Sequence, residues 1–186
     1  MKSWKLGLAI LVVLVALAVA PTTAQTDNSG GFDNSGGGEW VEYMSFPITT
    51  TPTEYAQYKI IINGATWEIY DVTGSLEATG TNENFWSLVQ SDGDDIRVFD
   101  QNNQLYFWIE YFSTTEQKAT IWVNLSAGST ELDVAYGNPS ATKSAYENRS
   151  QVFEFFDDFE DGDYTDKWVL DNLGGTFSVA ETEGVL

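Results

Sequence analysis

The chain has 186 residues, of which 28 are Asp or Glu and 8 are Lys or Arg, so its formal net charge is −20. A field of this sign repels phosphate backbones and argues against nucleic acid as a partner. The chain contains no Cys and no His, which excludes disulfides, thiol nucleophiles, Ser–His or Cys–His catalysis, and the usual zinc and haem ligand sets. Any bound metal would need oxygen ligands, which favours calcium or magnesium.

Residues 1–24 have the pattern of an export signal. Lys2 and Lys5 precede an uncharged apolar run that ends at Ala20, and small residues suited to cleavage follow up to Ala24. The run is short for a membrane span, which needs roughly 17–25 residues. We therefore expect an exported protein, secreted or at the cell surface, with membrane contact only through this segment if it is not cleaved.

Residues 25–39 are rich in Gly, Ser and Asn, and they contain an imperfect repeat that begins at Asn28 and again at Asn34. Such a composition buries too little apolar surface to order itself. We predict a flexible linker.

Residues 40–152 contain short strand-forming segments separated by turns. The first segment places Trp40, Met44, Phe46 and Ile48 on one side. Asn63-Gly64 separates two apolar segments, residues 58–62 and 65–72, which is a strong hairpin signal.

Further strands are expected at residues 119–125 and 131–136, and Ser144 to Glu147 has a capping-box pattern that indicates a short helix or turn. Residues 85–89 form an apolar element of uncertain type. Regular strand spacing with almost no helix predicts an all-β antiparallel β-sandwich, jelly-roll-like in arrangement.

Residues 92–112 are predicted to form a hairpin with a four-residue turn from Gln101 to Gln104. This register places Arg97 opposite Trp108 and diagonal to Glu110, with Asp95 on the same face. Two interpretations stay open: a cationic ligand-binding spot, or an internal clamp between Arg97 and Glu110. We favour the clamp.

Four motifs between Asp92 and Asn138 resemble the family of domain of unknown function 2341, a β-rich module of bacterial and archaeal surface proteins. In order they are Asp92-Gly93-Asp94-Asp95-Ile96-Arg97-Val98-Phe99-Asp100, Trp108-Ile109-Glu110, Ile121-Trp122-Val123 and Ala135-Tyr136-Gly137-Asn138. The resemblance covers roughly residues 40–152 and is looser before Phe85.

Residues 153–186 resemble the opening of a concanavalin A-like, laminin-G-type domain, through the run from Phe153 to Gly162 and the later Trp168. The resemblance implies a second sandwich of which only the start is present. The sequence is therefore expected to be a piece of a longer protein.

Candidate metal ligands gather around Gly162. Five carboxylates lie within seven residues, and calcium requires several such oxygens; the residues are Asp157, Asp158, Glu160, Asp161 and Asp163. The alternative is an open, solvated acidic loop. A smaller acidic group, Asp92, Asp94 and Asp95, is explained more simply as a turn at the start of a strand.

A glycosidase requires paired carboxylates directed into one cleft. Glu154, Asp157 and Glu160 are spaced by three residues, and this spacing places carboxylates on different faces of a strand. We therefore predict no catalytic residues.

Three tryptophans, Trp86, Trp108 and Trp122, are candidate platforms for sugar rings, although a Trp at strand spacing is more often a core residue. Asn124 and Asn148 lie in N-glycosylation sequons.

Together these features predict a non-catalytic extracellular or cell-surface β-sandwich module that contacts carbohydrate or mediates adhesion, with polysaccharide or other surface proteins as partners. The alternatives are an assembly component of a surface layer or filament, and a fragment of a secreted polysaccharide-acting enzyme.

Overall fold

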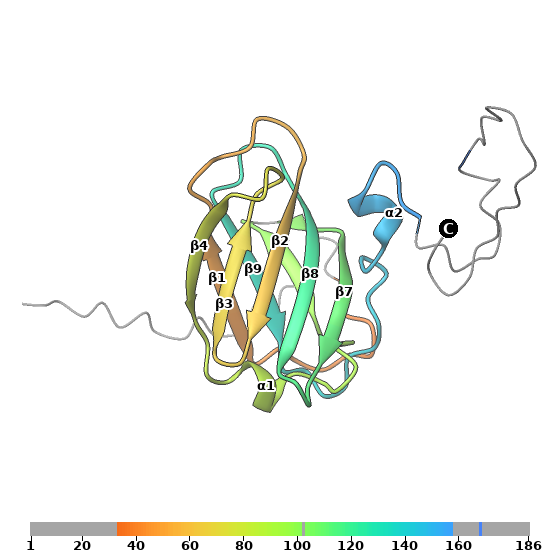
Figure 1. Ribbon diagram of the computed structural model, residues 1–186. Helices are drawn as coiled ribbons and strands as arrows, with labels where there is room; N and C mark the ends of the chain where they lie inside the picture. The colour runs from red at the N-terminus through yellow and green to blue at the C-terminus, as the bar shows by residue number, and fades with distance from the viewer. Residues whose placement is uncertain (1–32, 102, 158–167, 169–186) are drawn as a thin grey trace, which may run out of the picture.

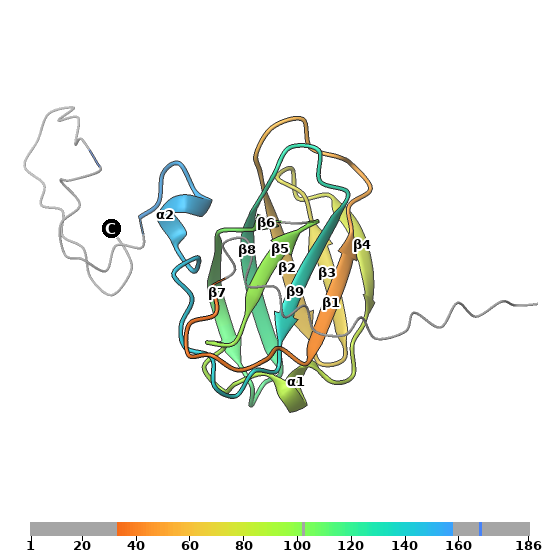
Figure 2. The ribbon, with the colours of Figure 1, turned by 180° about the vertical axis from the view of Figure 1, so that it is seen from behind.

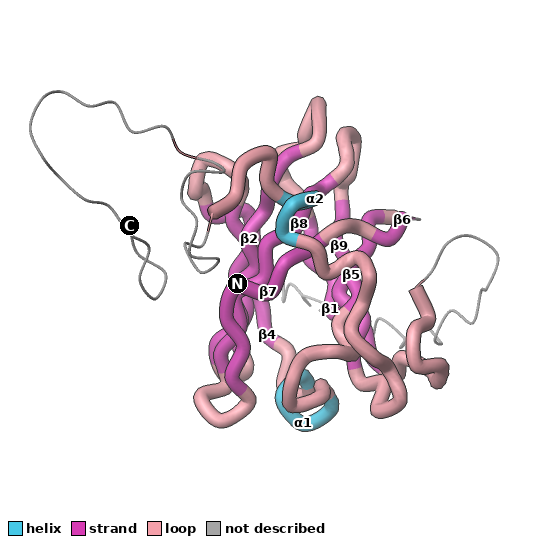
Figure 3. The backbone as a smooth tube through the Cα atoms, turned by 90° about the vertical axis from the view of Figure 1, so that its right-hand side faces the viewer, coloured by secondary structure: helices cyan, strands magenta, loops and turns pink. Residues whose placement is uncertain are grey.

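The computed structural model describes residues 33–101, 103–157 and 168. These residues form two antiparallel sheets that pack face to face, seen from the front in Figure 1 and as separate layers from the side in Figure 3. Sheet A has the strand order β1-β9-β5-β6, and sheet B has the order β4-β3-β2-β8-β7. The predicted all-β sandwich is confirmed.

The strands are β1 (Glu42–Pro47), β2 (Ala56–Asn63), β3 (Thr66–Tyr70), β4 (Leu76–Thr81), β5 (Arg97–Asp100), β6 (Asn103–Gln104), β7 (Phe107–Ser113), β8 (Lys118–Leu125) and β9 (Glu131–Tyr136). Two short helices, α1 (Phe85–Leu88) and α2 (Arg149–Val152), complete the described part. Neither helix has the length and apolar character needed to cross a membrane. The predicted export signal, residues 1–24, lies outside the described residues.

Side-chain alternation builds the core between the sheets. Along β2, Tyr58, Ile60 and Ile62 are buried, while the residues between them point outward. β1 contributes Met44 and Phe46, as its alternation predicts. Because each sheet has one apolar inner face, packing the two faces together removes both from water, and burial of this kind contributes about 25 cal/mol per Å² of apolar area.

The predicted hairpin around Asn63-Gly64 is confirmed, with a shift of one position. β2 and β3 pair from Lys59 opposite Tyr70 to Asn63 opposite Thr66, so Gly64 and Ala65 are the two turn residues. Gly64 has φ +57°, a left-handed conformation that a residue without Cβ adopts at little cost.

The predicted hairpin across residues 92–112 is wrong. β5 pairs with β6 and β9 in sheet A, whereas β7 pairs with β8 in sheet B. The chain changes sheets between two neighbours: the Leu105 N–H donates to the Val98 carbonyl (2.8 Å) in sheet A, and the Tyr106 carbonyl accepts from the Asn124 N–H (3.0 Å) in sheet B. The apolar side chains of β5 and β7 therefore both enter the core, but from opposite layers.

The Arg97–Glu110 clamp fails for the same reason. Arg97 lies on the outer side of sheet A, and Glu110 is exposed on sheet B, where it accepts a hydrogen bond from Trp122. Asp95 is buried and accepts the backbone N–H groups of Gln90, Gly137 and Asn138 at 2.9, 2.7 and 3.2 Å. Burial raises the pKa of Asp95, and these three donors partly oppose that rise.

Residues 33–38, which we call the N-terminal strap, cover Arg97 on the outer side of sheet A, the sheet that faces the viewer in Figure 2. The Arg97 side chain is 0% exposed. Its guanidinium donates to the carbonyls of Asp33 (2.9 Å), Asp94 (2.8 Å) and Thr142 (2.8 Å), and also to the hydroxyl of Ser35 (2.9 Å). The same group lies 5.0 Å from the centroid of the Trp40 ring, within range for a cation–π contact.

The strap is also fixed by close backbone packing. Gly36 has φ +87°, and a Cβ there would lie 2.1 Å from the Ser140 carbonyl oxygen, so this position requires glycine. The Asn138 side chain donates to the Gly37 carbonyl at 2.9 Å. The prediction of a flexible linker up to Glu39 is therefore wrong for residues 33–38, because Arg97 and the loop at 138–142 supply the partners that the segment lacks by itself.

Replacing Arg97 by Met should lower the free energy of unfolding by roughly 2–5 kcal/mol, because several buried carbonyls lose their donor and the strap loses its anchor. Chemical denaturation with a tryptophan signal measures this loss. Lys118→Ala is the control, because Lys118 is exposed, and it should stay within about 0.5 kcal/mol of the parent. Equal stability of both variants would contradict the anchoring role of Arg97.

The carboxylate of Asp33 adds a pH dependence. Burial by itself would raise its pKa, but hydrogen bonds from Ser144 (2.6 Å), Ser35 (3.1 Å) and Ala145 (3.0 Å) together lower the pKa below the ordinary value of 3.8. A carboxyl group with a lowered folded-state pKa stabilises the fold above its ordinary value, and this stabilisation is lost as the pH falls through the folded-state value.

Asp33→Asn should therefore be less stable than the parent at pH 7, by roughly 1–2 kcal/mol. The difference should shrink as the pH falls below 3.8, because the parent carboxylate then becomes protonated. Urea denaturation of both proteins across this pH range provides the test. A stability difference that stays constant down to the lowest pH would show that ionisation of Asp33 is not involved.

Candidate functional site

Trp108 and Trp122 lie side by side on the outer face of sheet B. They are directly opposite one another in the β7–β8 ladder, and both are half-buried. Their strand neighbours Phe107, Ile121 and Val123 point into the core and are buried, so period-two alternation directs both indoles away from it.

The segment that follows α2 crosses this face. The Asn148 side chain caps α2 by accepting from the Ser150 N–H. Side chains from sheet B then hold the end of the helix: Gln57 donates to the Val152 carbonyl (3.1 Å), and Asn124 donates to the Gln151 carbonyl (3.0 Å). Residues 153–157 are thereby directed along the two tryptophans.

Two phenylalanines of this segment pack against the indoles. Phe153 lies 5.8 Å from Trp108 and 5.4 Å from Trp122 between ring centroids, and Phe156 lies 4.8 Å from Trp108. All three contacts are edge-to-face, the geometry that the ring quadrupole favours. Arg149 adds a guanidinium 4.8 Å from the centroid of the Phe156 ring. Four aromatic rings from three elements therefore form one cluster, with a cation at one side.

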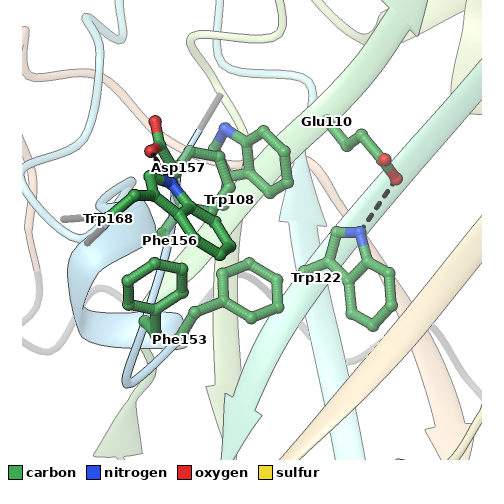
Figure 4. A pocket seen from close by; sticks show the side chains of 8 residues that line it. Trp108, Glu110, Trp122, Phe153, Phe156, Asp157 and Trp168 are labelled. Atoms are coloured by element: carbon green, nitrogen blue, oxygen red, sulfur yellow. Dashed lines mark hydrogen bonds between the residues drawn. The ribbon is translucent and has the colours of Figure 1, made fainter. Parts of the chain in front are cut away.

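These rings line an open pocket of about 420 Å³, within the range of about 300–1,000 Å³ for small-molecule sites. Figure 4 shows the pocket, whose lining residues are Trp108, Glu110, Trp122, Phe153, Phe155, Phe156, Asp157 and Trp168. We call this set the aromatic pocket.

Two carboxylates supply its polar groups. Glu110 accepts from the Trp122 indole N–H at 2.9 Å, and Asp157 accepts from the Trp168 indole N–H at 2.6 Å. The Glu110 carboxylate has further lone pairs, so it can accept additional hydrogen bonds from a ligand. Apolar ring faces beside acceptor oxygens suit a ligand that presents both C–H surfaces and hydroxyl groups.

The third predicted platform, Trp86, does not join this site. It belongs to α1, its indole N–H donates to the Gly64 carbonyl at 2.8 Å, and its ring packs against Phe85 and Phe112 at 4.8 and 5.6 Å. Its position is that of a half-buried residue at the edge of the core. The structure thus brings together two of the three predicted tryptophans.

The candidate calcium ligands fall mostly outside the described residues, which include Asp157 but not Asp158, Glu160, Asp161 or Asp163. Within residues 33–101, 103–157 and 168, no three acidic side chains are grouped so as to hold a metal ion. In the smaller acidic group, Asp92 accepts the Asp94 N–H at 3.2 Å, which is a turn contact. The calcium site at 157–163 stays a prediction.

Both sequon asparagines make structural contacts. Asn124 uses its amide nitrogen to hold the Gln151 carbonyl, and Asn148 uses its side-chain oxygen to cap α2. A glycan on Asn124 would compete with the contact that positions α2. Asn148 would have to bear a glycan on the same amide that forms the cap.

Sequence reasoning missed the part that residues 153–157 play in this site. It assigned Phe153, Phe155 and Phe156 to a following domain, whereas Phe153 and Phe156 pack on the first sandwich. The closely spaced phenylalanines were the available signal. The surface on which these phenylalanines pack could not be predicted, because the sequence does not show that Trp108 and Trp122 are neighbours.

The fold and this site define a β-sandwich protein with an aromatic surface pocket. Residues 92–171 match the family described as Domain of unknown function (DUF2341). The predicted resemblance is confirmed there, and the match extends past Val152 into the segment that covers the tryptophans. The comparisons find no match among curated proteins or solved structures.

Phe153→Ser should release residues 153–157 from sheet B, because this ring contacts both tryptophans. Cleavage after Glu154 by a glutamate-specific protease should become faster in this variant, since proteolysis requires an accessible, extended segment. Tyr55→Ser is the control, as Tyr55 is 69% exposed and is not a lining residue of the aromatic pocket, and its cleavage rate should stay near that of the parent. Indistinguishable rates for all three proteins would contradict the proposed packing.

Proposed function

We propose that this protein is a non-catalytic, carbohydrate-contacting module, and that the aromatic pocket on sheet B is its binding site. The observation that carries the proposal is the adjacent pair Trp108 and Trp122 on an outer sheet face, beside carboxylate acceptors. Sugar rings offer C–H groups on their faces and hydroxyls at their edges. Aromatic faces are attractive to the former, and carboxylates accept from the latter.

The chemistry of the pocket supports binding in preference to turnover. Its ionisable groups are Glu110 and Asp157, and each already accepts an indole N–H. Glu110 is exposed on a bulge of β7, where the register shifts between Ile109 and Tyr111. Solvent at an exposed carboxylate weakens its electrostatic interactions, which does not favour general acid catalysis.

A role outside the cytoplasm fits the predicted export signal at residues 1–24 and the strongly acidic composition. An exported module that contacts polysaccharide would serve adhesion or attachment.

Trp122→Ala should weaken binding of neutral oligosaccharides by about tenfold or more, because loss of a stacking ring costs on the order of 1 kcal/mol or more. Titration of the mature protein with a panel of soluble oligosaccharides, followed by tryptophan fluorescence and calorimetry, measures the affinity. Tyr55→Ala is the control, because Tyr55 is 69% exposed and is not a lining residue of the pocket.

Failure of the parent protein to bind any member of a glycan array, in the presence of calcium, would overturn the proposal. Ordered polymers formed by the purified protein without any glycan would instead support the assembly role.

A further inference from the structure

The two pocket tryptophans belong to a longer row of outward side chains on sheet B. Trp108 is opposite Trp122, Trp122 is opposite Lys59, and Lys59 is opposite Tyr70. The row therefore crosses β7, β8, β2 and β3 in a line perpendicular to the strands. All four side chains are half-buried, whereas their strand neighbours on β2, β8 and β3 point into the core. We call these four residues the sheet B row.

The spacing of the row exceeds the size of one sugar ring. Neighbouring strands lie about 4.8 Å apart, so Tyr70 is about 10 Å from Trp122 and about 14 Å from Trp108 along the row. A single monosaccharide cannot contact Tyr70 and the aromatic pocket together. An extended chain of several sugar units can do so.

Lys59 lies between the rings. Its ammonium is 5.4 Å from the centroid of Tyr70 and 5.4 Å from that of Trp122. Both distances are within the cation–π range of about 6 Å. Its long aliphatic stem covers the sheet between the rings, and the ammonium supplies donors for ligand oxygens.

The polar atoms of the Trp122 and Tyr70 rings are already hydrogen-bonded to glutamates. Trp122 donates its N–H to Glu110 at 2.9 Å, and Tyr70 donates its hydroxyl to Glu68 at 2.7 Å. The hydrogen bond to Glu68 raises the pKa of Tyr70, so the phenol stays neutral at physiological pH. These hydrogen bonds hold both rings in place at their polar atoms, and the Lys59 ammonium lies over each ring.

The charges along the row select the ligand class. One ammonium, on Lys59, stands between two carboxylates, those of Glu68 and Glu110, on a chain of net charge −20. A polyanionic chain would meet repulsion from both carboxylates and from the overall field. A chain of uncharged sugars can donate to the carboxylates and accept from Lys59.

We propose that the sheet B row is an extended binding face for an uncharged polysaccharide chain, which runs from the aromatic pocket across β8 and β2 to Tyr70 on β3. This inference rests on the proposed function and adds the class and direction of the ligand. The polymer lies perpendicular to the strands and is bound through its internal sugar units. Its affinity therefore depends on its length.

The test compares the parent, Tyr70→Ala and Tyr70→Phe in titrations with neutral glucan, xylan and mannan oligosaccharides, from disaccharide to octasaccharide. For the parent, affinity should rise with length until the ligand spans the row. Tyr70→Ala should bind the longest oligosaccharides about tenfold more weakly and the disaccharides equally well, while Tyr70→Phe, which keeps the ring but loses the hydrogen bond to Glu68, should have an affinity between those of the parent and Tyr70→Ala for the longest oligosaccharides.

Two outcomes overturn the extended face and leave the pocket intact: affinity independent of length, or an unchanged affinity of Tyr70→Ala for long oligosaccharides. Tighter binding of a uronic acid oligomer than of a neutral chain of the same length overturns the choice of an uncharged ligand. Absence of binding to any saccharide overturns the proposed function itself. Circular dichroism and melting of each variant confirm that Tyr70 substitutions leave the fold unchanged.

Discussion

The change of sheet between Leu105 and Tyr106 determines much of this structure. It places β5 in sheet A and β7 in sheet B, so the apolar residues of the two strands meet across the core. It also joins β7 to β8, and that pairing sets Trp108 beside Trp122 on the outer face. A local hairpin of residues 92–112 would have set Trp108 opposite Arg97 and left no paired tryptophans. One change of layer therefore makes both the core and the candidate site.

The two outer faces of the sandwich differ in their side chains and in the chain segments that cover them. On sheet A, a buried arginine binds the N-terminal strap through backbone carbonyls, and its charge is balanced by nearby Asp33 and Asp95. A guanidinium without these acceptors would be too costly to bury. Sheet B instead carries half-buried aromatic rings, partly covered by residues 153–157. The first face is covered around Arg97 by chain segments, and the second carries aromatic rings beside carboxylates.

The aromatic pocket shows how a packing contact and a binding surface can share the same residues. Phe153 and Phe156 pack edge-to-face against the tryptophans and thereby orient them, and these rings line an open pocket. Prior ordering of ring platforms lowers the entropic cost of binding. The same contacts join residues that follow α2 to the first sandwich, in agreement with a family match that continues past Val152.

The sequence by itself determined the fold class, the strands β1, β2, β8 and β9, the turn at Gly64 and the family resemblance, which the match over residues 92–171 supports. Alternation and turn chemistry are local properties, and they specify which side of a strand is buried. They do not specify which strand is its hydrogen-bond partner, because backbone donors and acceptors are alike at every residue. Only the tertiary structure decided that β5 and β7 lie in different sheets, that Arg97 anchors residues 33–38, and that Trp108, Trp122, Lys59 and Tyr70 form one row.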